Sequence, residues 1–397
     1  MQNPDALFSS PEDLHYSTSI SAIYAGRIVP FLGAGANLCD RPDGIAWKRG
    51  EYLPSGVELA GYLASRFGYL PSTDLARVSQ YVALIGGGSA PLYEALRDLF
   101  GINYPPTLLH KFLAILPKVA RDRGHAPPYQ LIVTTNYDDV LERTFHLAGE
   151  PFDVVSYMAE GEDRGKFRHW SYIFKPKAEP TLRPRREQED EIEYQLYVTH
   201  YQKEWAEYQR QQLPGQLEKD EAEFKDAKAW PPKVDSQLIT KPNEYPSLSL
   251  DHRPVILKIH GAVDRITPQE EGEDRLDSFV ITEDDYIDYL TRTDLSALVP
   301  KKLEAKLRRS NFLFLGYSLR DWNLRVILRR IWGEQKLKFN SWAIQLNPED
   351  LDQIFWMRRD VQIINKPLSD YIRELINRLD ANSYINELEE KIQALQS

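Results

Sequence analysis

The chain has 397 residues, of which 42% are hydrophobic and 11% aromatic, so it can bury a sizeable core and is not a disordered chain. Its formal net charge of −10 disfavours direct binding of nucleic acid, because such binding relies on Lys and Arg side chains that neutralise phosphates. The single cysteine, Cys39, excludes an internal disulfide and a four-cysteine zinc site. Since no secretion signal and no apolar run of ~20 residues is recognisable, we expect a cytoplasmic protein without a membrane span.

Short apolar runs alternate with helical patterns along most of the chain. A first helix is predicted from the cap at Ser10-Pro11 to about Gly26. Strands are predicted at 28–32, 131–133, 255–259, 312–315, 342–346 and 361–364. Further helices are predicted around 56–68, 73–85, 90–100, 107–118, 137–148 and 321–332, and a last helix from about 369 to 395. The alternation predicts a Rossmann-like, doubly wound parallel sheet that binds its ligand at the carboxyl ends of the strands.

The stretch 158–250 interrupts this alternation, because it is rich in Glu, Lys, Gln and Arg and contains a long polar helical section near 187–228. We interpret it as a charged, mainly helical insertion, so that 1–157 and 251–397 form one domain. The insertion is either a solvated excursion or a partner-binding arm. The predicted last helix has four apolar residues on one face: Ile385, Leu388, Ile392 and Leu395. Such a face suits packing on the core or on another subunit.

A run of small residues, Gly33-Ala34-Gly35-Ala36, follows the first predicted strand directly. Small residues let the backbone approach a diphosphate, whose charge can be met by N–H groups and a helix N-terminus. The run is not a G-x-G-x-x-G fingerprint and includes no P-loop lysine, so a plain tight turn is the alternative interpretation.

Three further strand ends are followed by residues that could serve a binding site. Asn136 could hold a ribose hydroxyl or a water, or cap a helix, and Asp138 would favour a helix start by opposing its dipole. His260 stands before a glycine at the end of the third strand and is either a general base or a structural histidine. Gly316 and Ser318 form either a turn that contacts phosphate or ribose or an ordinary strand–turn–helix junction.

In this order, the motifs Gly33–Ala36, Thr134–Asp138, Lys258–Gly261 and Leu315–Asp321 resemble the sirtuin-like family of NAD-consuming domains. More narrowly, they resemble its prokaryotic NAD-hydrolysing branch, which acts in antiphage defence. The resemblance extends over about 25–365 and leaves the insertion out. Two more segments are similar to that branch: Leu53–Gly56 and Phe279–Tyr286.

The resemblance implies a role for each matching residue. It assigns four small residues to the NAD diphosphate: Gly33, Ala34, Gly35 and Ala36. It makes Asn136 the residue that orders the nicotinamide ribose and the attacking water, and His260 the base that acts on a ribose hydroxyl or on water. Gly316 and Ser318 would complete the nucleotide pocket, with Asp138 as a further NAD contact.

The chain also departs from deacetylating sirtuins, because one cysteine cannot build their four-cysteine zinc module. The resemblance therefore implies an NAD glycohydrolase that uses NAD as its substrate, needs no metal, and releases nicotinamide and ADP-ribose. It further implies a homo-oligomer, often with a DNA-translocase-type (HerA-like) ATPase or an Argonaute-like protein as partner. The competing hypotheses are a protein deacylase or ADP-ribosyltransferase, a non-catalytic sensor or scaffold that binds NAD or ADP-ribose, and a nucleic-acid-binding module.

Overall fold

The computed structural model describes residues 10–125, 129–172, 183, 185, 190–211, 230, 234, 236–265, 276–291, 299–317 and 341–396. The strands are β1 (Ile28–Leu32), β2 (Leu131–Thr134), β3 (Phe152–Tyr157), β4 (Phe167–Tyr172), β5 (Ser236–Ile239), β6 (Val255–Lys258), β7 (Gly261–Ala262), β8 (Ser278–Phe279), β9 (Asn311–Leu315), β10 (Ser341–Gln345) and β11 (Val361–Asn365). The α-helices are α1 (Pro11–Tyr24), α2 (Gly56–Phe67), α3 (Leu75–Ile85), α4 (Ala90–Phe100), α5 (Leu108–Asp122), α6 (Val140–Ala148), α7 (Glu191–Gln211), α9 (Glu283–Thr291), α11 (Lys301–Arg308), α13 (Asp350–Met357), α14 (Leu368–Arg378) and α15 (Asn382–Gln396). Two short 3-10 helices are η2 (Ala34–Leu38) and η3 (Pro242–Glu244).

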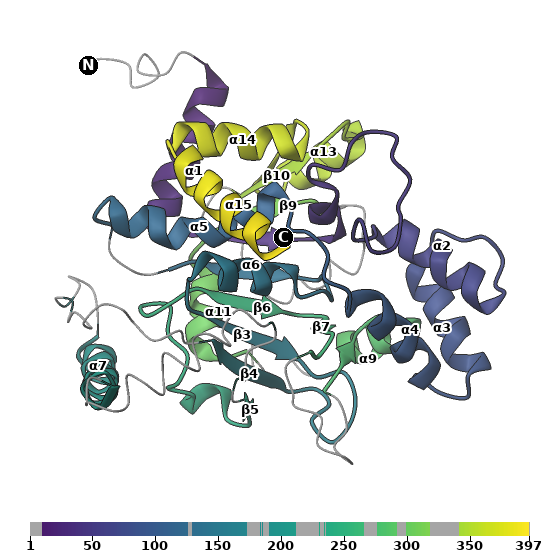
Figure 1. The fold of residues 1–397 in the computed structure, drawn as a ribbon, viewed down its shortest axis with the longest axis horizontal. Helices are drawn as coiled ribbons and strands as arrows, with labels where there is room; N and C mark the ends of the chain where they lie inside the picture. Colours follow the sequence, from purple (N-terminus) through teal and green to yellow (C-terminus); the bar gives the residue numbers. More distant parts are fainter. Residues whose placement is uncertain are drawn as a thin grey trace.

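Within the described residues, nine strands form one sheet in the order β11-β10-β9-β1-β2-β6-β3-β4-β5 (Figure 1). Neighbouring strands from β11 to β3 are parallel, whereas β4 pairs antiparallel with β3 and β5 antiparallel with β4. Every residue of β1, β2, β6 and β9 is buried, which explains why the sequence of these strands is almost wholly apolar. The predicted Rossmann-like α/β fold is confirmed.

Successive residues of the central strands pack into two different hydrophobic clusters, one on each face of the sheet. In β1, Ile28 and Leu32 belong to one cluster and Val29 and Phe31 to the other. The first face is covered by α1, α5, α6, α14 and α15, which Figure 1 shows gathered on one side. The second face is covered by residues of α9, α11 and α13. The sheet is therefore doubly wound.

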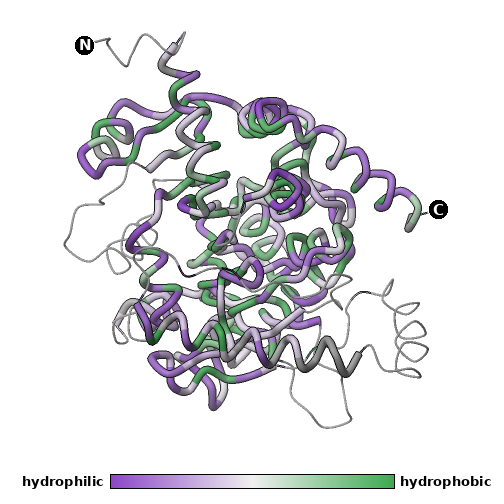
Figure 2. The backbone as a smooth tube through the Cα atoms, turned by 90° about the vertical axis from the view of Figure 1, so that its left-hand side faces the viewer, coloured by the Kyte–Doolittle hydropathy of each residue, from purple (hydrophilic) through white to green (hydrophobic). Residues whose placement is uncertain are grey.

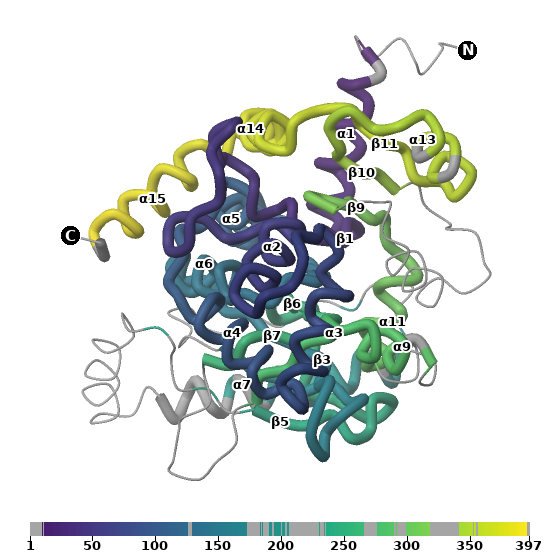
Figure 3. The backbone as a smooth tube through the Cα atoms, turned by 90° about the vertical axis from the view of Figure 1, so that its right-hand side faces the viewer, coloured from purple at the N-terminus to yellow at the C-terminus, as the bar shows by residue number. Residues whose placement is uncertain are grey.

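A third cluster joins α2, α3 and α4 to each other and to β8. In Figure 3 α2 and α3 lie in front of the sheet. Capping side chains define where these helices begin: Ser55 and Glu58 form a capping box at α2, and Asp74 accepts a hydrogen bond from the Arg77 backbone N–H at α3. These helices form one wall of the site described below.

The structure differs from the prediction in the middle of the chain. β3 had not been predicted, and two strands, β4 and β5, lie within the stretch 158–250 that had been interpreted as mainly helical. Of the long polar helix near 187–228, the structure describes α7. The proposed division into 1–157 plus 251–397 and an inserted 158–250 stays a prediction, and the helix predicted at 321–332 lies outside the described residues.

The C-terminal region contains two helices, α14 and α15, where one had been predicted. The break falls at Asp380, whose φ of 43° is incompatible with a continuing helix. Ile385 and Leu388 of α15 pack into the core, as the apolar face suggested, and the helix carries hydrophilic residues toward the C-terminus in Figure 2. Among the described residues, no helix combines the length and apolarity that a membrane span requires.

Candidate functional site

A cavity of ≈ 970 Å³ lies at the carboxyl ends of β1, β2, β6 and β9. The chain leaves β1 toward β2 on one side, whereas β9, β10 and β11 extend the sheet on the other side. Doubly wound sheets bind ligands at such a switch in strand order. Each of the four strand-end regions singled out in the sequence contributes to the cavity. Gly33, Asn136 and His260 represent the first three, and Gly316 is at the start of the fourth.

The loop after β1 and the loop after β9 touch each other through their backbones. The Gly33 N–H donates to the Leu315 carbonyl at 3.2 Å, and the Gly35 N–H donates to the Gly316 carbonyl at 2.7 Å. A Cβ atom on Gly35 would lie 2.5 Å from the Gly316 oxygen, and Gly316 itself has a φ of +65°. Small residues are therefore needed here because two loops approach each other closely. This contact between the loops had not been predicted from the sequence.

The four small residues do not all reach the cavity. Gly33, Ala34 and Gly35 line it, whereas Ala36 is 0% exposed and packs in the core beneath the loop. Ala34 is the first residue of η2, where a backbone N–H has no acceptor within the helix. Gly33, Gly35 and Ala36 already donate their N–H groups to backbone carbonyls, which leaves the Ala34 N–H as the candidate donor of this run.

Asn136 is held by three hydrogen bonds at the end of β2. Its backbone N–H donates to Thr134 Oγ1 at 3.0 Å, and its Nδ2 donates to the Gly33 carbonyl at 3.2 Å and to Asn37 Oδ1 at 3.5 Å. Its side-chain carbonyl accepts no hydrogen bond from the residues that the structure describes. The half-buried amide is therefore fixed in orientation and retains an acceptor for a ligand.

Asn37 is a site residue that had not been singled out. It lines the cavity, is 5% exposed and contacts Asn136 from the opposite loop. The signal was a polar side chain directly after a run of Gly and Ala, in a turn at the end of a buried strand.

His260 is 3% exposed and lines the cavity. The ring packs edge-on against Tyr286 and Tyr289, with centroid distances of 5.5 and 5.9 Å. Its Nε2 is buried and has no hydrogen-bond partner among the described residues. Burial lowers the pKa of His260 to about 3, so the imidazole is neutral at physiological pH.

Steric crowding explains why a glycine follows His260. Gly261 has a φ of +80°, and a Cβ atom there would lie 2.1 Å from the Ser278 carbonyl oxygen. This backbone contact pairs β7 with β8, and the Val280 N–H donates to the His260 carbonyl at 2.9 Å. The histidine is thus positioned by strand pairing on its carboxyl side.

Asp138 helps to begin α6, as the sequence suggested, and it also lines the cavity; its contact with NAD stays a prediction. Its Oδ1 accepts the Val140 backbone N–H at 3.1 Å. Burial raises the pKa of Asp138, and the nearby charge of Lys258 opposes this effect. Gly316 lines the cavity as well, whereas Ser318 lies outside the described residues.

The charged side chains along the cavity are acidic among the described residues: Asp74, Asp138 and Glu283. No group of three or more His, Cys, Asp or Glu side chains suited to a metal ion occurs in the part of the chain that the structure describes. Cys39 is buried, and this burial raises the pKa of its thiol to about 12, so it is not a reactive nucleophile.

A model of the SIR2-like domain family matches residues 130–364, which is more than half of the chain. A search of the curated proteins returned no match. The matched range begins at β2 and contains Asn136, Asp138, His260 and Gly316, while the loop after β1 precedes it. SIR2-like domains use NAD as a substrate, and a cavity at the strand-order switch of a doubly wound sheet suits a dinucleotide. The chain belongs to the SIR2-like domain family.

Proposed function

We propose that this protein is an NAD glycohydrolase, which cleaves the bond between nicotinamide and ribose and releases nicotinamide and ADP-ribose. The observation that carries the proposal is the pairing of Asn136 and His260 in one cavity. A fixed amide with a free acceptor and a neutral imidazole with an unpartnered Nε2 come from two different strands and line the same space.

In this reaction the main task of the protein is to position the ribose and the water. Nicotinamide leaves as a neutral molecule when the C1′–N bond breaks, and positive charge develops on the ribose. A water oxygen then bonds to C1′ and loses a proton. Asn136 would orient the ribose and this water, and His260 would accept the proton from the water or from a ribose hydroxyl. The imidazole is neutral at physiological pH, so its Nε2 lone pair is free before the reaction begins.

The diphosphate would lie against the loop after β1. Because the N–H groups of Gly33 and Gly35 are already bonded to the β9 side, the contact falls mainly on the Ala34 amide. With acidic residues along the described part of the cavity, the backbone and not a basic side chain would meet the phosphates there.

We further propose that the activity depletes cellular NAD in antiphage defence, in the cytoplasm. An enzyme that destroys NAD must be held inactive in healthy cells, so control by assembly is expected. Candidates are a homo-oligomer and a partner of the HerA-like DNA-translocase ATPase or Argonaute-like type. The alternatives are a protein deacylase or ADP-ribosyltransferase and a sensor that binds NAD without cleaving it.

The test is product analysis of the purified chain incubated with NAD, alone and together with co-expressed products of neighbouring genes. Asn136→Ala and His260→Ala should each abolish nicotinamide and ADP-ribose formation. The matched controls are Asn382→Ala and His125→Ala, which change exposed residues that do not line the cavity and should leave turnover unchanged. Acyl-ADP-ribose or labelled protein would favour a transferase, and NAD binding without turnover would favour a sensor.

A further inference from the structure

Lys258 is the last residue of β6, and its side chain is 2% exposed. A buried ammonium needs hydrogen-bond partners, because the cost of removing a charge from water is otherwise several kcal/mol. Its Nζ lies 2.7 Å from Glu142 Oε1 in the first turn of α6 and also donates to the backbone carbonyl of Asp138. Lys258 therefore connects the strand that leads to His260 with the loop that carries Asn136.

The strand register makes this connection significant. β2 and β6 pair in parallel with Thr134 opposite Lys258, so Asn136 and His260 each stand two residues beyond the last paired position. The relative placement of the two side chains thus depends on how the two short segments after the strands are held against each other.

Three carbonyl groups of the Asn136 segment face the His260 segment. The Thr134 carbonyl accepts the Ile259 N–H at 3.1 Å, and the Tyr137 carbonyl accepts the Val263 N–H at 2.9 Å. These two bonds are between backbones and could form with many sequences. The third carbonyl, that of Asp138, is held by the Lys258 side chain.

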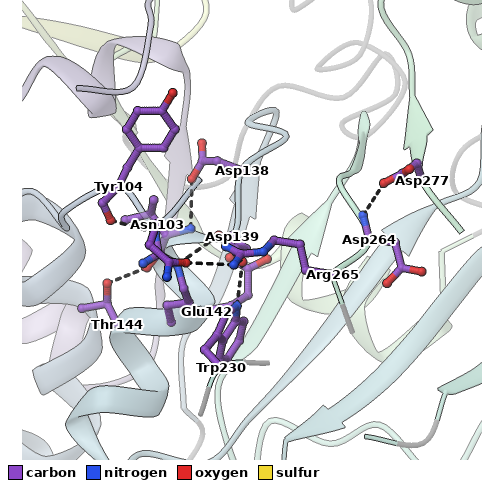
Figure 4. Close-up of polar contacts among 12 residues, drawn as sticks. Asn103, Tyr104, Asp138, Asp139, Glu142, Thr144, Trp230, Asp264, Arg265 and Asp277 are labelled. Atoms are coloured by element: carbon purple, nitrogen blue, oxygen red, sulfur yellow. Dashed lines mark hydrogen bonds and ion pairs between the residues drawn. The ribbon is translucent and has the colours of Figure 1, made fainter. Parts of the chain in front are cut away.

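Two more side chains hold the same segment: Arg265, which follows β7, and Trp230 of the insertion. Figure 4 shows Arg265 and Trp230 converging on Asp139, at 3.0 and 2.7 Å from its Oδ2, and the Asp138 carboxylate directed at the start of α6. These contacts do not reach β6. Among the described residues, Lys258 supplies the side-chain hydrogen bond from β6 to the Asn136 segment.

A buried ion pair is in general weak evidence for a role in stability. Replacing a buried pair by apolar residues of similar size is commonly neutral or stabilising, because both charges must be removed from water. Burial raises the pKa of Glu142, and the Lys258 charge opposes that rise. A small cavity of ≈ 30 Å³ beside the pair, lined by Lys258 and Glu142 among others, is large enough for a water that could meet a further ammonium proton.

We propose that Lys258 is a positioning residue for this site: by bonding the Asp138 carbonyl it sets the position of Asn136 relative to His260. This inference rests on the proposed NAD cleavage, since it concerns how the two residues of that reaction are aligned. Lys258 would not touch the substrate.

The test uses the full chain with the double substitution Lys258→Met/Glu142→Leu, which removes both charges and retains volume. The matched control is Arg121→Met/Glu150→Leu, which removes another ion pair with a buried carboxylate, one that does not line the cavity. In the Lys258 variant kcat for nicotinamide release should fall about 10- to 100-fold, because small misplacements are costly in catalysis, with KM for NAD changed less than about threefold. The control should retain both values.

A lower kcat could also reflect fewer folded molecules, so a second readout is needed. With methanol added, the ratio of methyl ADP-riboside to ADP-ribose reports how well water is selected and does not depend on the amount of active protein. This ratio should rise in the Lys258 variant and stay unchanged in the control. If the variant does not fold, Lys258→Gln/Glu142→Gln should show the same rise.

Amide hydrogen exchange of residues 135–139 separates this inference from the proposed function. Faster exchange in the Lys258 variant, with β2 and β6 unchanged, supports the inference whether or not NAD is cleaved. If the unaltered chain releases no nicotinamide, the proposed function fails. Amide hydrogen exchange alone then tests whether Lys258 positions the Asn136 segment. Unchanged exchange, or an unchanged product ratio in an active variant, would overturn the role assigned to Lys258.

Discussion

Replacing Gly35 by alanine tests whether the loops after β1 and β9 must touch. The added Cβ atom would lie 2.5 Å from the Gly316 carbonyl oxygen, whereas ordinary van der Waals contact begins at 3.4 Å. The obstacle is backbone and cannot rotate away. The two loops would have to separate by about 0.9 Å, which stretches the 2.7 Å hydrogen bond between Gly35 and Gly316 beyond hydrogen-bonding distance.

The expected loss of stability follows from three terms. The broken hydrogen bond costs about 0.5–1.5 kcal/mol and the crowding about 1–3 kcal/mol. The lower entropy of the unfolded alanine chain offsets roughly 0.4–1 kcal/mol, which leaves a net loss of about 2 kcal/mol. With an unfolding entropy of about 0.8 kcal/mol/K for 397 residues, the midpoint of thermal unfolding should fall by roughly 2–3 °C.

Thermal unfolding of three variants provides the assay. Gly56→Ala is the matched control, because Gly56 lines the same cavity and a Cβ atom there meets nothing within 4 Å. Gly316→Ala should be less stable than Gly35→Ala, since its φ of +65° adds strain to a contact of 2.0 Å with the Ala36 nitrogen. The rise in midpoint on adding NAD should also shrink in Gly35→Ala. Equal midpoints for Gly35→Ala and Gly56→Ala would refute the reasoning.

Other expected outcomes concern titration, reactivity and the attachment of the insertion. Burial lowers the pKa values of His110 and His260 to about 3, whereas these side chains take up protons near pH 6.5 in the unfolded chain. Between pH 6.5 and about pH 4, the free energy of unfolding should therefore fall as the pH is lowered, by up to about 1.4 kcal/mol per pH unit for each of the two histidines. Urea unfolding at pH 7 and pH 5 measures this, and His260→Gln should make the dependence shallower; a flat profile for the unaltered chain would contradict it. Cys39 should resist iodoacetamide at pH 7.5 in the folded protein and react in urea, since burial raises the pKa of its thiol to about 12; mass spectrometry that finds rapid labelling of the native chain would count against this. Trp230→Phe should lower the free energy of unfolding by roughly 1–2 kcal/mol, because it removes the 2.7 Å hydrogen bond to Asp139 and keeps the stacking on Tyr172; an unchanged urea midpoint would show that this bond contributes nothing.

The sequence predicted those strands whose side chains are apolar on both faces, and it failed where polar side chains are satisfied by distant partners. β3 contains Asp153, which is 0% exposed and accepts hydrogen bonds from Arg253 at 2.8 Å and from His169 at 3.1 Å. Partners so far away in the chain cannot be inferred from local periodicity. β5 is a half-exposed edge strand, and its short pattern resembles a loop.

The candidate site was partly predictable, because a polar residue that directly follows an apolar strand can be recognised from the local sequence. Asn136 and His260 were both placed at the carboxyl ends of strands, where the predicted fold binds its ligand, and both line one cavity. The contacts that hold them, from Asn37 and Lys258, were not predictable, since they depend on which loops face each other in three dimensions. The small residue at Gly35 was explained by a ligand or by a tight turn, and the close contact with the loop after β9 was not predicted.

The position of β6 between β2 and β3 determines when the site can form during synthesis. β2 and β3 leave the ribosome roughly 100 residues ahead of β6, yet each pairs with β6 and not with the other. Until β6 arrives, both strands present open edges, which are prone to unwanted pairing and slow to find distant partners. A nascent chain that has not reached His260 already contains Asn136 but lacks the residue that would act as the base in the proposed reaction. Interrupted translation would therefore leave an incomplete chain that is prone to aggregate and lacks half of the candidate site.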